Sequence, residues 1–538
     1  MRSLRIWLAV CACVLALALA LPAAAQEQAD WWHDTVFYEI FVRSFYDSDG
    51  DGVGDFNGVT ERLDYLNDGD PATTDDLGVT GLWLMPIMES PSYHGYDVTN
   101  YNEVEPDYGT MADFERLVSE AHSRGIRVII DLPFNHSSRE HPWFVESQAG
   151  AEPYNSWYLW EERSPGWKGP QNQTVWHAAS GRYYYALFWE GMPDLNYTNP
   201  DVTAEMTRIA QFWLDKGVDG FRLDGVKHVI EEGRDQENTA ATVAWLTDYR
   251  AAIRAIDPDA LIVAEIWSST FEVAPYVESG AVDLAFEFDL ATAALQSAGN
   301  ERASSVRNIQ ARALRQFNGA NYAPFLTNHD QNRVMFGLRD EDKARTAARL
   351  LLTSPGVPFI YYGEEIGMTG AKPDERIRTP MQWTDDDENA GFTTGRPWQG
   401  LQSDLETANV AVQTDQAGSL LDTYRTMIRL RGALGLGRGT WRGVESEADA
   451  VYSFVHMSDD ADAPASLVVI NLSDEPIADY TLTYDGDLGG RATATGYDGL
   501  DSAAGASQPI LSTDGGFVAY QPTPGLAPYE VLVVWLAR

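Results

Sequence analysis

The sequence predicts an α/β protein built on a (β/α)8 TIM barrel, with an inserted subdomain after the third strand and a C-terminal antiparallel β-sandwich. Short β-rich apolar runs alternate with helix-like stretches over most of the chain, which favours a parallel sheet covered by helices. The connection after His136 runs to about Pro200, far too long for an ordinary loop. Beyond about Leu436, helical periodicity gives way to alternating runs separated by turn residues.

These observations divide the chain into four predicted parts. Residues 1–25 are a signal peptide, 26–136 and 201–435 form the barrel, 137–200 form the inserted domain, and 436–538 form the C-terminal domain. With 538 residues, the chain is long enough for several domains and a large core.

The N-terminal segment has the pattern of a secretory signal. Arg2 and Arg5 precede an apolar run from Ile6 to Leu21, and three alanines before Gln26 offer small residues for cleavage. We therefore expect a secreted protein, extracellular or periplasmic. The run is short for a membrane span, and an uncleaved anchor is the alternative.

Charge and cysteine content restrict the partners and the chemistry. The formal net charge is −42, and a polyanion repels nucleic acid and acidic membranes. We expect a neutral partner, no nucleic acid, no membrane after signal cleavage, and a monomer. Cys11 and Cys13 both lie in the signal segment, so the mature chain is expected to lack disulfides and thiol chemistry.

About eight apolar runs are candidates for the barrel strands, the number that closes such a barrel. They are Val36–Phe41, Gly81–Met85, Arg127–Leu132, Gly220–Leu223, Leu261–Ala264, Leu284–Phe288, Phe325–Thr327 and Pro358–Tyr362. Helical patterns fill the gaps, among them Met111–Arg124, Thr203–Lys216, Thr239–Ile256 and Glu341–Thr353. In the last part of the chain, Val451–His456, Ser466–Ile470, Tyr480–Tyr484 and Val531–Leu536 are predicted sandwich strands.

Polar residues cluster just beyond the predicted barrel strands. They are Asp131, Asn135, His136, Arg222, Asp224, Glu265, His329, Asp330, Glu364 and Glu365. In a barrel such residues meet at the carboxyl-terminal face, where barrel enzymes carry their sites.

Asp224, Glu265 and Asp330 end different strands and are the candidate catalytic residues. Arg222 points to the same side of an extended strand as Asp224, and its charge favours the ionised carboxylate. Two carboxyls of unequal pKa on either side of a bond are the equipment for glycoside hydrolysis. Asp224 is then the nucleophile, Glu265 the protonated acid, and Asp330 stabilises a cationic transition state. A structural ion pair of Arg222 with Asp224 is the alternative for that pair taken alone.

A second acidic cluster lies from Asp47 to Val59. Its oxygen donors are the carboxylates of Asp47, Asp49, Asp51 and Asp55 and the main-chain carbonyl of Val53. This spacing matches the opening of a calcium loop, although Gly58 replaces the bidentate Glu of an EF-hand. We expect Ca²⁺ here, because four close carboxylates otherwise repel one another. The alternative is a solvated acidic turn.

Aromatic residues are frequent in the predicted insertion, and sugar faces stack on such side chains. They are Trp157, Trp160, Trp167, Trp176, Tyr183, Tyr184 and Tyr185. The alternative is that most of them form the core of the insertion.

Four motifs resemble, in order and spacing, the signature regions of the α-amylase family of glycoside hydrolases. They are DLPFNH (Asp131–His136), GFRLDGVKH (Gly220–His228), AEIW (Ala264–Trp267) and TNHD (Thr327–Asp330). MPDLN (Met192–Asn196), GLWLMPI (Gly81–Ile87) and GEEIGM (Gly363–Met368) resemble accessory regions. The resemblance spans roughly Trp31 to Arg431.

The resemblance implies a role for each matching residue. It makes Asp224 the nucleophile, Glu265 the general acid/base and Asp330 the transition-state stabiliser of a retaining double displacement. It places Tyr96, His136, Arg222 and His329 around the reacting sugar, and Lys227 and His228 beyond the cleavage point. It also implies a calcium site made by Asn135, Asp194 and the carbonyl of His228, and a second one in the Asp47 loop.

The subfamily signals are mixed. RTPMQW (Arg378–Trp383) and the Asp47 loop resemble oligo-1,6-glucosidases and trehalose synthases, whereas Lys227 with His228 resembles α-amylases, and MPDLN an intermediary bacterial group. Tyr93 stands where exo-acting relatives carry an Asp. We therefore predict an α-amylase acting on internal α-1,4 bonds. The alternatives are an exo-acting α-glucosidase or oligo-1,6-glucosidase, a glucan-rearranging enzyme similar to trehalose synthase, and an inactive binding protein on the same fold.

Overall fold

The computed structural model describes residues 30–497 and 506–538. The predicted signal peptide, residues 1–25, therefore lies outside the described residues. Among the helices that are described, none combines the length and the apolar character needed to cross a membrane.

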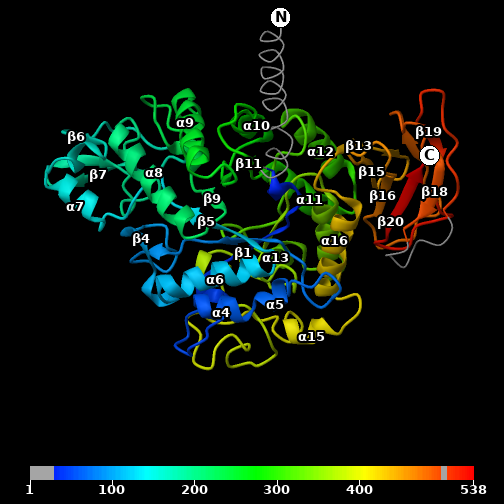
Figure 1. The fold of residues 1–538 in the computed structure, drawn as a ribbon, viewed down its shortest axis with the longest axis horizontal. Helices are drawn as coiled ribbons and strands as arrows, with labels where there is room; N and C mark the ends of the chain where they lie inside the picture. Colours follow the sequence, from blue (N-terminus) through cyan, green and yellow to red (C-terminus); the bar gives the residue numbers. More distant parts are fainter. Residues whose placement is uncertain (1–29, 498–505) are drawn as a thin grey trace, which may run out of the picture.

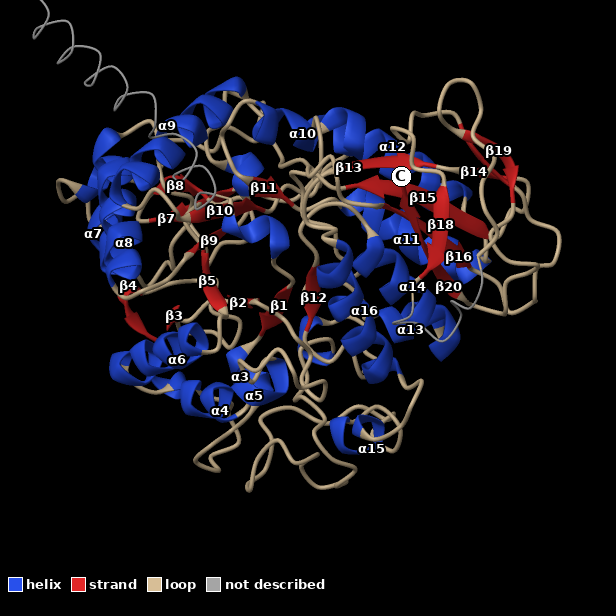
Figure 2. Ribbon diagram, turned by 45° about the vertical axis from the view of Figure 1, so that its right-hand side comes forward, coloured by secondary structure: helices blue, strands red, loops and turns tan. Residues whose placement is uncertain are grey.

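Seven parallel strands curl into a sheet in the order β11-β10-β9-β5-β2-β1-β12. They are β1 (Phe37–Ile40), β2 (Gly81–Leu84), β5 (Arg127–Leu132), β9 (Gly220–Leu223), β10 (Leu261–Ala264), β11 (Leu284–Ala285) and β12 (Phe359–Tyr361). Helices surround this sheet in Figures 1 and 2. The predicted fold class, a TIM barrel with an inserted segment and a C-terminal sandwich, is confirmed.

The helices of the barrel layer follow the strands along the chain. They are α3 (Val42–Phe45), α4 (Phe56–Glu61), α5 (Leu63–Leu66), α6 (Met111–Ser123), α8 (Pro200–Asp215), α9 (Ala240–Ile256), α10 (Thr270–Glu278), α11 (Phe288–Asn300), α12 (Ser304–Gln316), α13 (Val334–Leu338), α14 (Glu341–Thr353) and α16 (Leu420–Leu434). Helix α8 begins at Pro200, before the predicted Thr203, because the Asn199 side chain accepts from the Asp201 N–H and Pro200 suits the first helical position.

The predicted strand Phe325–Thr327 is wrong, because these residues have no strand assignment. The segment just before it bridges the two edges of the sheet instead. Ala323 pairs with Phe286 beside β11, and Phe359 of β12 donates to the Pro324 carbonyl at 2.9 Å. Proline has no N–H to give, so a regular ladder cannot run through this segment. The barrel is thus closed by an irregular stretch. The strand predicted to reach Phe288 is also shorter, since α11 begins there.

Large side chains fill the barrel. Phe37 and Phe359 stack with ring centroids 4.6 Å apart, and Trp83 and Phe286 lie at 5.4 Å. These rings belong to a buried cluster contributed by several strands. The barrel interior is therefore a packed core, and the chemistry is restricted to its rim.

The segment predicted as an insertion carries its own small sheet. It contains α7 (Pro142–Gln148), β6 (Trp160–Glu161), β7 (Trp176–Ala179) and β8 (Arg182–Tyr185), with strand order β6-β8-β7. An antiparallel bridge between His136 and Asp194 ties both ends of the segment to the end of β5. The insertion therefore stands beside the carboxyl ends of the barrel strands. A further hairpin, β3 (Met88–Glu89) and β4 (Asn100–Val104), follows β2.

The last part of the described chain forms two antiparallel sheets. One has the order β13-β15-β16-β20-β18 and the other β14-β17-β19. Their bounds are β13 (Thr440–Gly443), β14 (Glu445–Ser446), β15 (Val451–Met457), β16 (Ala465–Asn471), β17 (Leu482–Tyr484), β18 (Thr493–Gly496), β19 (Phe517–Tyr520) and β20 (Val531–Ala537). One buried cluster includes Leu467 of the first sheet and Phe517 of the second, as expected for a sandwich.

Candidate active site

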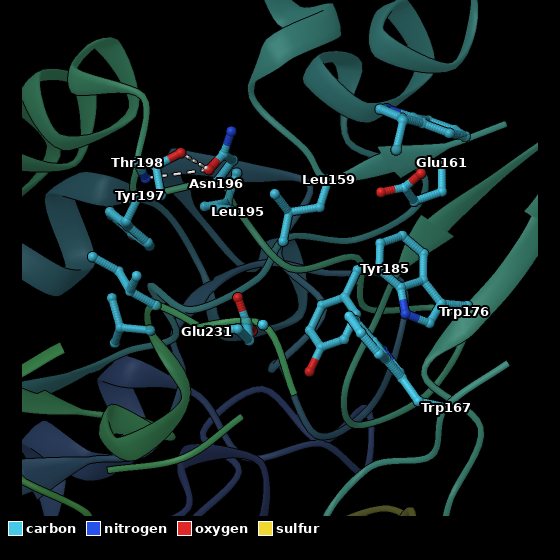
Figure 3. Close-up of a pocket in the computed structure, with 14 residues that line it drawn as sticks. Leu159, Glu161, Trp167, Trp176, Tyr185, Leu195, Asn196, Tyr197, Thr198 and Glu231 are labelled. Atoms are coloured by element: carbon cyan, nitrogen blue, oxygen red, sulfur yellow. Dashed lines mark hydrogen bonds between the residues drawn. The ribbon is translucent and has the colours of Figure 1, made fainter. Parts of the chain in front are cut away.

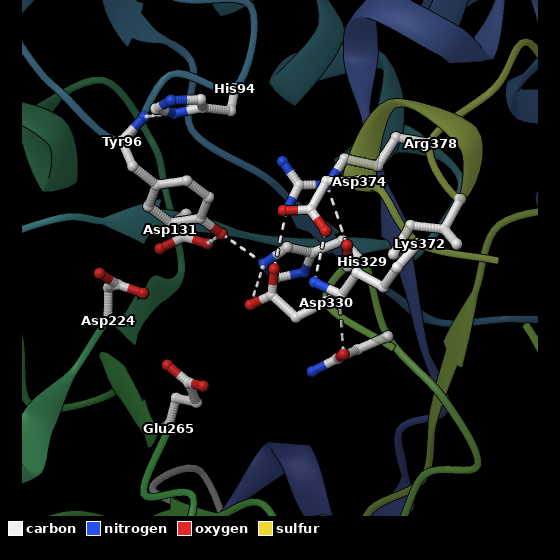
Figure 4. Close-up of polar contacts among 12 residues, drawn as sticks. His94, Tyr96, Asp131, Asp224, Glu265, His329, Asp330, Lys372, Asp374 and Arg378 are labelled. Carbon is white, nitrogen blue, oxygen red and sulfur yellow. Dashed lines mark hydrogen bonds and ion pairs between the residues drawn. The ribbon is translucent and has the colours of Figure 1, made fainter. Parts of the chain in front are cut away.

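The candidate catalytic residues come together at the carboxyl ends of the barrel strands. Asp131 is in β5, Asp224 directly follows β9, and Glu265 directly follows β10. Asp330 lies in the turn after the irregular closing segment. Figure 4 shows the carboxyls of Asp224, Glu265 and Asp330 around one common space. Parallel topology brings these strand ends together although they are far apart along the chain.

Arg222 is the centre of the arrangement. Its fully buried guanidinium places Nη1 at 2.9 Å from Asp224 Oδ1 and Nη2 at 3.0 Å from Glu265 Oε2. The same Nη1 donates to both oxygens of Asp131, at 2.9 and 2.8 Å. One cation therefore holds three carboxyls in place. The predicted pairing of Arg222 with Asp224 is part of this larger network, since neither residue is an isolated strand cap.

Burial governs the protonation of the two central carboxyls. Burial raises the pKa of Asp224 to about 7, because it outweighs the opposing charge of Arg222. Burial likewise raises the pKa of Glu265 to about 7. The predicted effect of Arg222 on Asp224 is present but does not outweigh burial, whereas the raised pKa of Glu265 agrees with the predicted protonated acid. Asp224 and Glu265 titrate in the same range and together hold about one proton near neutrality.

Asp330 has a different environment. Burial opposes its ionisation, but the positive charges of Arg378, Lys372 and Arg222 favour the carboxylate, and the pKa of Asp330 lies below its usual range. Nη2 of Arg378 lies 2.8 Å from Asp330 Oδ1. Asp330 is therefore a permanent negative charge facing Asp224 and Glu265. In the sequence, Arg378 stood out only as part of the RTPMQW motif, and its contact with Asp330 was not predicted.

Tyr96, His329 and Glu39 form a buried relay beside Asp330. The Tyr96 hydroxyl lies 2.6 Å from His329 Nε2, and the two rings stack with centroids 5.7 Å apart. His329 Nδ1 bonds Glu39 on the other side. Burial lowers the pKa of His329 well below its usual value, so the ring is neutral. Sequence reasoning missed Glu39; the only signal was an acidic residue inside the apolar run of β1.

His136 is buried next to the same space. Neither of its ring nitrogens makes a well-formed hydrogen bond within residues 30–497 and 506–538, although the main chain of Tyr96 is close enough to favour the protonated ring. Burial lowers the pKa of His136 to about 3, so it is a neutral imidazole with one free donor and one free acceptor. Buried polar groups are normally paired, and a ligand hydroxyl would complete this one.

Lys227 and His228 line a pocket that opens from Glu265. It has a volume of about 270 Å³, and its other walls are Gln171, Phe188, Gly225 and Trp267. We call it the acceptor-side pocket. Lys227 Nζ donates to the Trp267 carbonyl at 3.1 Å, which holds the amine at the rim. Phe188 and Trp267 are 41% and 47% exposed, a degree that is unusual for large apolar rings and that sequence alone did not reveal.

The Asp47 loop brings together three of its four predicted carboxylates. Oxygens of Asp47, Asp49 and Asp55 lie within 4.8 Å of one another. Asp51 is outside this group and accepts from the Val53 N–H at 2.8 Å. Hard carboxylate oxygens in this number fit Ca²⁺. A Cβ on Gly52, which has φ +98°, would lie 2.1 Å from the Arg396 carbonyl, so the loop needs glycine there.

Asn135 and Asp194 also meet as predicted from the resemblance. Asn135 Nδ2 donates to Asp194 Oδ2 at 3.1 Å, and the Leu187 N–H donates to Asp194 Oδ1 at 2.9 Å. His228 lies on the next loop, where its Nδ1 contacts the Gln236 carbonyl at 2.9 Å. Burial raises the pKa of Asp194 to about 7, and within the described chain its hydrogen-bond partners are neutral. A buried carboxylate of this kind fits a bound cation.

The barrel and its three convergent carboxyls define a class of protein, a barrel enzyme equipped to cleave a glycosidic bond. Residues 39–436 match the family model described as Alpha amylase, catalytic domain. The chain therefore belongs to the α-amylase family of glycoside hydrolases, which confirms the resemblance found in its motifs.

Individual relatives carry different activities. Alpha-amylase 3 of Dictyoglomus thermophilum is 42% identical over 410 residues, which cover 74% of this chain and 77% of the relative. Oligo-1,6-glucosidase of Parageobacillus thermoglucosidasius is 32% identical over 477 residues, covering 74% and 83%. The crystal structure of alpha-amylase from H. orenii aligns with a TM-score of 0.81 and 39% identity, covering 93% of this chain and 99% of that one. The family thus supports a carbohydrate substrate without selecting one linkage.

Proposed function

We propose that the protein is a secreted α-amylase that hydrolyses internal α-1,4-glucosidic bonds of starch and maltooligosaccharides with retention of configuration. The main observation behind the proposal is that the guanidinium of Arg222 contacts both Asp224 and Glu265 and so holds them side by side. Retaining glycosidases keep their two carboxyls about 5 Å apart, whereas inverting ones are wider to admit a water. Two carboxyls on one guanidinium support the retaining arrangement.

In the first step, an oxygen of Asp224 forms a bond to the anomeric carbon while the glycosidic C–O bond breaks. Glu265 gives its proton to the departing oxygen. The pKa of about 7 that burial gives Glu265 means that the proton is present near neutral pH. As Glu265 becomes an anion, Asp224 becomes a neutral ester, so the charge near Arg222 stays balanced.

In the second step, Glu265 takes a proton from water, and the resulting hydroxide attacks the anomeric carbon and breaks the ester to Asp224. Positive charge develops on the sugar in both steps. Asp330 stays ionised through its contact with Arg378 and stabilises that charge.

The acceptor-side pocket supports cleavage within a chain. It continues from Glu265 to Lys227 and His228, so sugar units beyond the cleaved bond have walls to contact. Tyr93 packs against Trp398 with ring centroids 5.5 Å apart. Tyr93 brings no charge to recognise a chain end, unlike the Asp that the resemblance places there in exo-acting relatives.

The alternative is an exo-acting α-glucosidase, an oligo-1,6-glucosidase or a glucan-rearranging enzyme. The Parageobacillus relative and the RTPMQW motif favour it. The early products from soluble starch distinguish internal cleavage from these alternatives. A spread of maltooligosaccharides supports internal cleavage, whereas glucose as the sole early product would overturn it. Activity on maltose alone, with trehalose formed, would indicate the rearranging enzyme.

We also propose that the Asp47 loop holds Ca²⁺. Asp47, Asp49 and Asp55 would hold the ion, which would compensate their mutual repulsion. Asn135 and Asp194 are candidates for a second ion, with the carbonyl of His228 as the remaining ligand implied by the resemblance. Secretion by the 1–25 segment and a monomeric state complete the proposal, and mass determination of the exported protein tests both.

A further inference from the structure

A second pocket lies at the junction between the inserted segment and the barrel, and none of its lining residues belongs to the acceptor-side pocket. We call it the junction pocket. Its volume is about 200 Å³. Figure 3 shows the rings of Trp167, Trp176 and Tyr185 gathered on one side of it, with Glu231 facing Tyr185. Tyr185 belongs to a small buried cluster with Val175 and Leu187, and the half-buried rings of Trp167 and Trp176 pack against it and line the cavity.

The aromatic wall is continuous. Trp176 meets Tyr185 edge to face at 5.3 Å, and Trp167 lies 6.3 Å from Trp176. The guanidinium of Arg234 sits over Trp167 at 5.6 Å from the ring centre. Leu159 and Leu195 line the pocket as well. Such a wall offers broad apolar faces to a flat ligand.

The wall residues also carry polar atoms without partners. Nε1 of Trp167, Nε1 of Trp176 and Oε1 of Glu231 are all buried and have no hydrogen-bond partner in the part of the chain that the structure describes. Native proteins leave few buried polar groups unpaired. These atoms have almost no accessible surface, and the polar edge of the pocket is provided by Glu161, Asn196 and Thr198, which also line it.

A hexopyranose has this combination of properties. Its C–H faces are apolar and stack on aromatic rings, while its hydroxyls donate and accept at the edge. The volume of about 200 Å³ is below the roughly 300–1,000 Å³ of pockets for drug-sized ligands, so one sugar ring fits better than several.

The junction pocket shares a wall with the catalytic side. His228 lines the acceptor-side pocket, and Glu231, three residues later, lines the junction pocket. Gln236 braces this wall: its side chain accepts from the Tyr185 hydroxyl at 3.1 Å and donates to the Lys168 carbonyl at 3.1 Å. We propose that the junction pocket binds a single glucosyl unit of an α-glucan, outside the catalytic centre. The identity of the sugar rests on the proposed function.

The test uses the mature protein carrying Asp224→Asn, so that the probe, maltotriose, is not consumed. Calorimetric titration is expected to resolve two classes of site. Adding Trp167→Ala should weaken one class at least tenfold and leave the other unchanged. Trp176→Phe keeps an aromatic ring in the wall but reduces its area, so it should weaken the same class by a smaller factor. Because Trp176→Phe is a conservative substitution, it can test the proposal by itself if Trp167→Ala fails to fold.

Phe271→Ala is the matched control, since Phe271 is 57% exposed on α10 and lines neither pocket; it should retain both classes. A single class of site in the Asp224→Asn parent would overturn the proposal, as would two classes that both survive Trp167→Ala and Trp176→Phe. Starch hydrolysis by the unmodified enzyme is measured separately and tests the proposed function. Two classes of maltotriose site in Asp224→Asn, without starch hydrolysis by the unmodified enzyme, would reject the proposed function but support binding in the junction pocket. Starch hydrolysis together with a single class of site would support the proposed function and reject binding in the junction pocket.

Discussion

Arg378 and Asp330, 48 positions apart in the sequence, lie with Nη2 and Oδ1 at 2.8 Å. Arg378 also donates its Nε to the His329 carbonyl at 2.9 Å, so it holds the main chain of the turn and the side chain that follows. The Arg378 side chain is 3% exposed, and screening by solvent is weak there. The electrostatic state of Asp330 therefore depends on Arg378.

Replacing Arg378 tests this dependence. Burial alone would raise the pKa of Asp330, and Arg378 counters that effect. In Arg378→Met the pKa of Asp330 should therefore rise, and the acid limb of the kcat/KM profile, which Asp224 sets, should become steeper at low pH as Asp330 takes up a second proton. Turnover should also fall by up to about a hundredfold, because the turn shifts. Arg376→Met, at an exposed position in the 3-10 turn Asp374–Arg376, is the control. An unchanged acid limb would contradict the assignment.

The pH profile of the unmodified enzyme follows from the shared environment of Asp224 and Glu265. Burial raises the pKa of each to about 7. Below that range Asp224 gains a proton and stops being a nucleophile; above it Glu265 loses the proton that the leaving group needs. We expect a bell-shaped kcat/KM profile with its maximum near pH 7, measured on a maltooligosaccharide. A flat profile from about pH 5 to about pH 9 would argue against this pair.

Asp224→Asn tests the nucleophile. The variant keeps the shape of the side chain but cannot form the ester, so turnover should fall by about 10⁴-fold or more. Glucan binding should persist, because Arg222 and His136 remain. Asp215→Asn, at the exposed end of α8, is the control for a general effect of the substitution. Near-normal turnover in Asp224→Asn would show that Asp224 is not the nucleophile. Turnover at background level in both the unmodified protein and Asp224→Asn would instead favour the inactive binding protein.

Removal of calcium tests the Asp47 loop. A ligand that binds only the folded chain stabilises it by about 2.7 kcal/mol at a hundredfold excess over Kd. A chelator should therefore lower the melting temperature by several degrees in wild type and by much less in Asp47→Asn. Asp70→Asn is the control, because Asp70 lies in another acidic turn, where it accepts from the Ala72 N–H. Equal shifts in wild type and Asp47→Asn would locate the stabilising ion elsewhere.

Tyr93→Asp tests the selection of internal bonds. A carboxylate at this position would restore the charge that the resemblance assigns to exo-acting relatives. We expect the share of glucose among early products from starch to increase, as measured by chromatography of the products. Tyr93→Phe keeps the ring packed on Trp398 and should preserve the wild-type distribution. No change in Tyr93→Asp would mean that residue 93 does not select chain ends.

The sequence predicted the barrel because its strands and helices are local patterns. Arg127–Leu132, Gly220–Leu223 and Leu261–Ala264 were found at their observed bounds. The prediction failed at Phe325–Thr327, where a short apolar run suggested a strand. Pro324 and the bridge of Ala323 to Phe286 decide that stretch, and the bridge is a contact between segments distant in sequence.

The same division holds for the site. The spacing of the motifs was enough to select Asp224, Glu265 and Asp330 and the family that carries them. The tertiary structure alone revealed that Arg222 serves three carboxyls, that Glu39 supports His329, and that Gln171 and Trp267 line the acceptor side. Burial also decided the protonation of Asp224 against the local charge of Arg222. Residue type and strand periodicity are properties of neighbouring residues, whereas desolvation and long-range pairing depend on which distant segments the fold packs together.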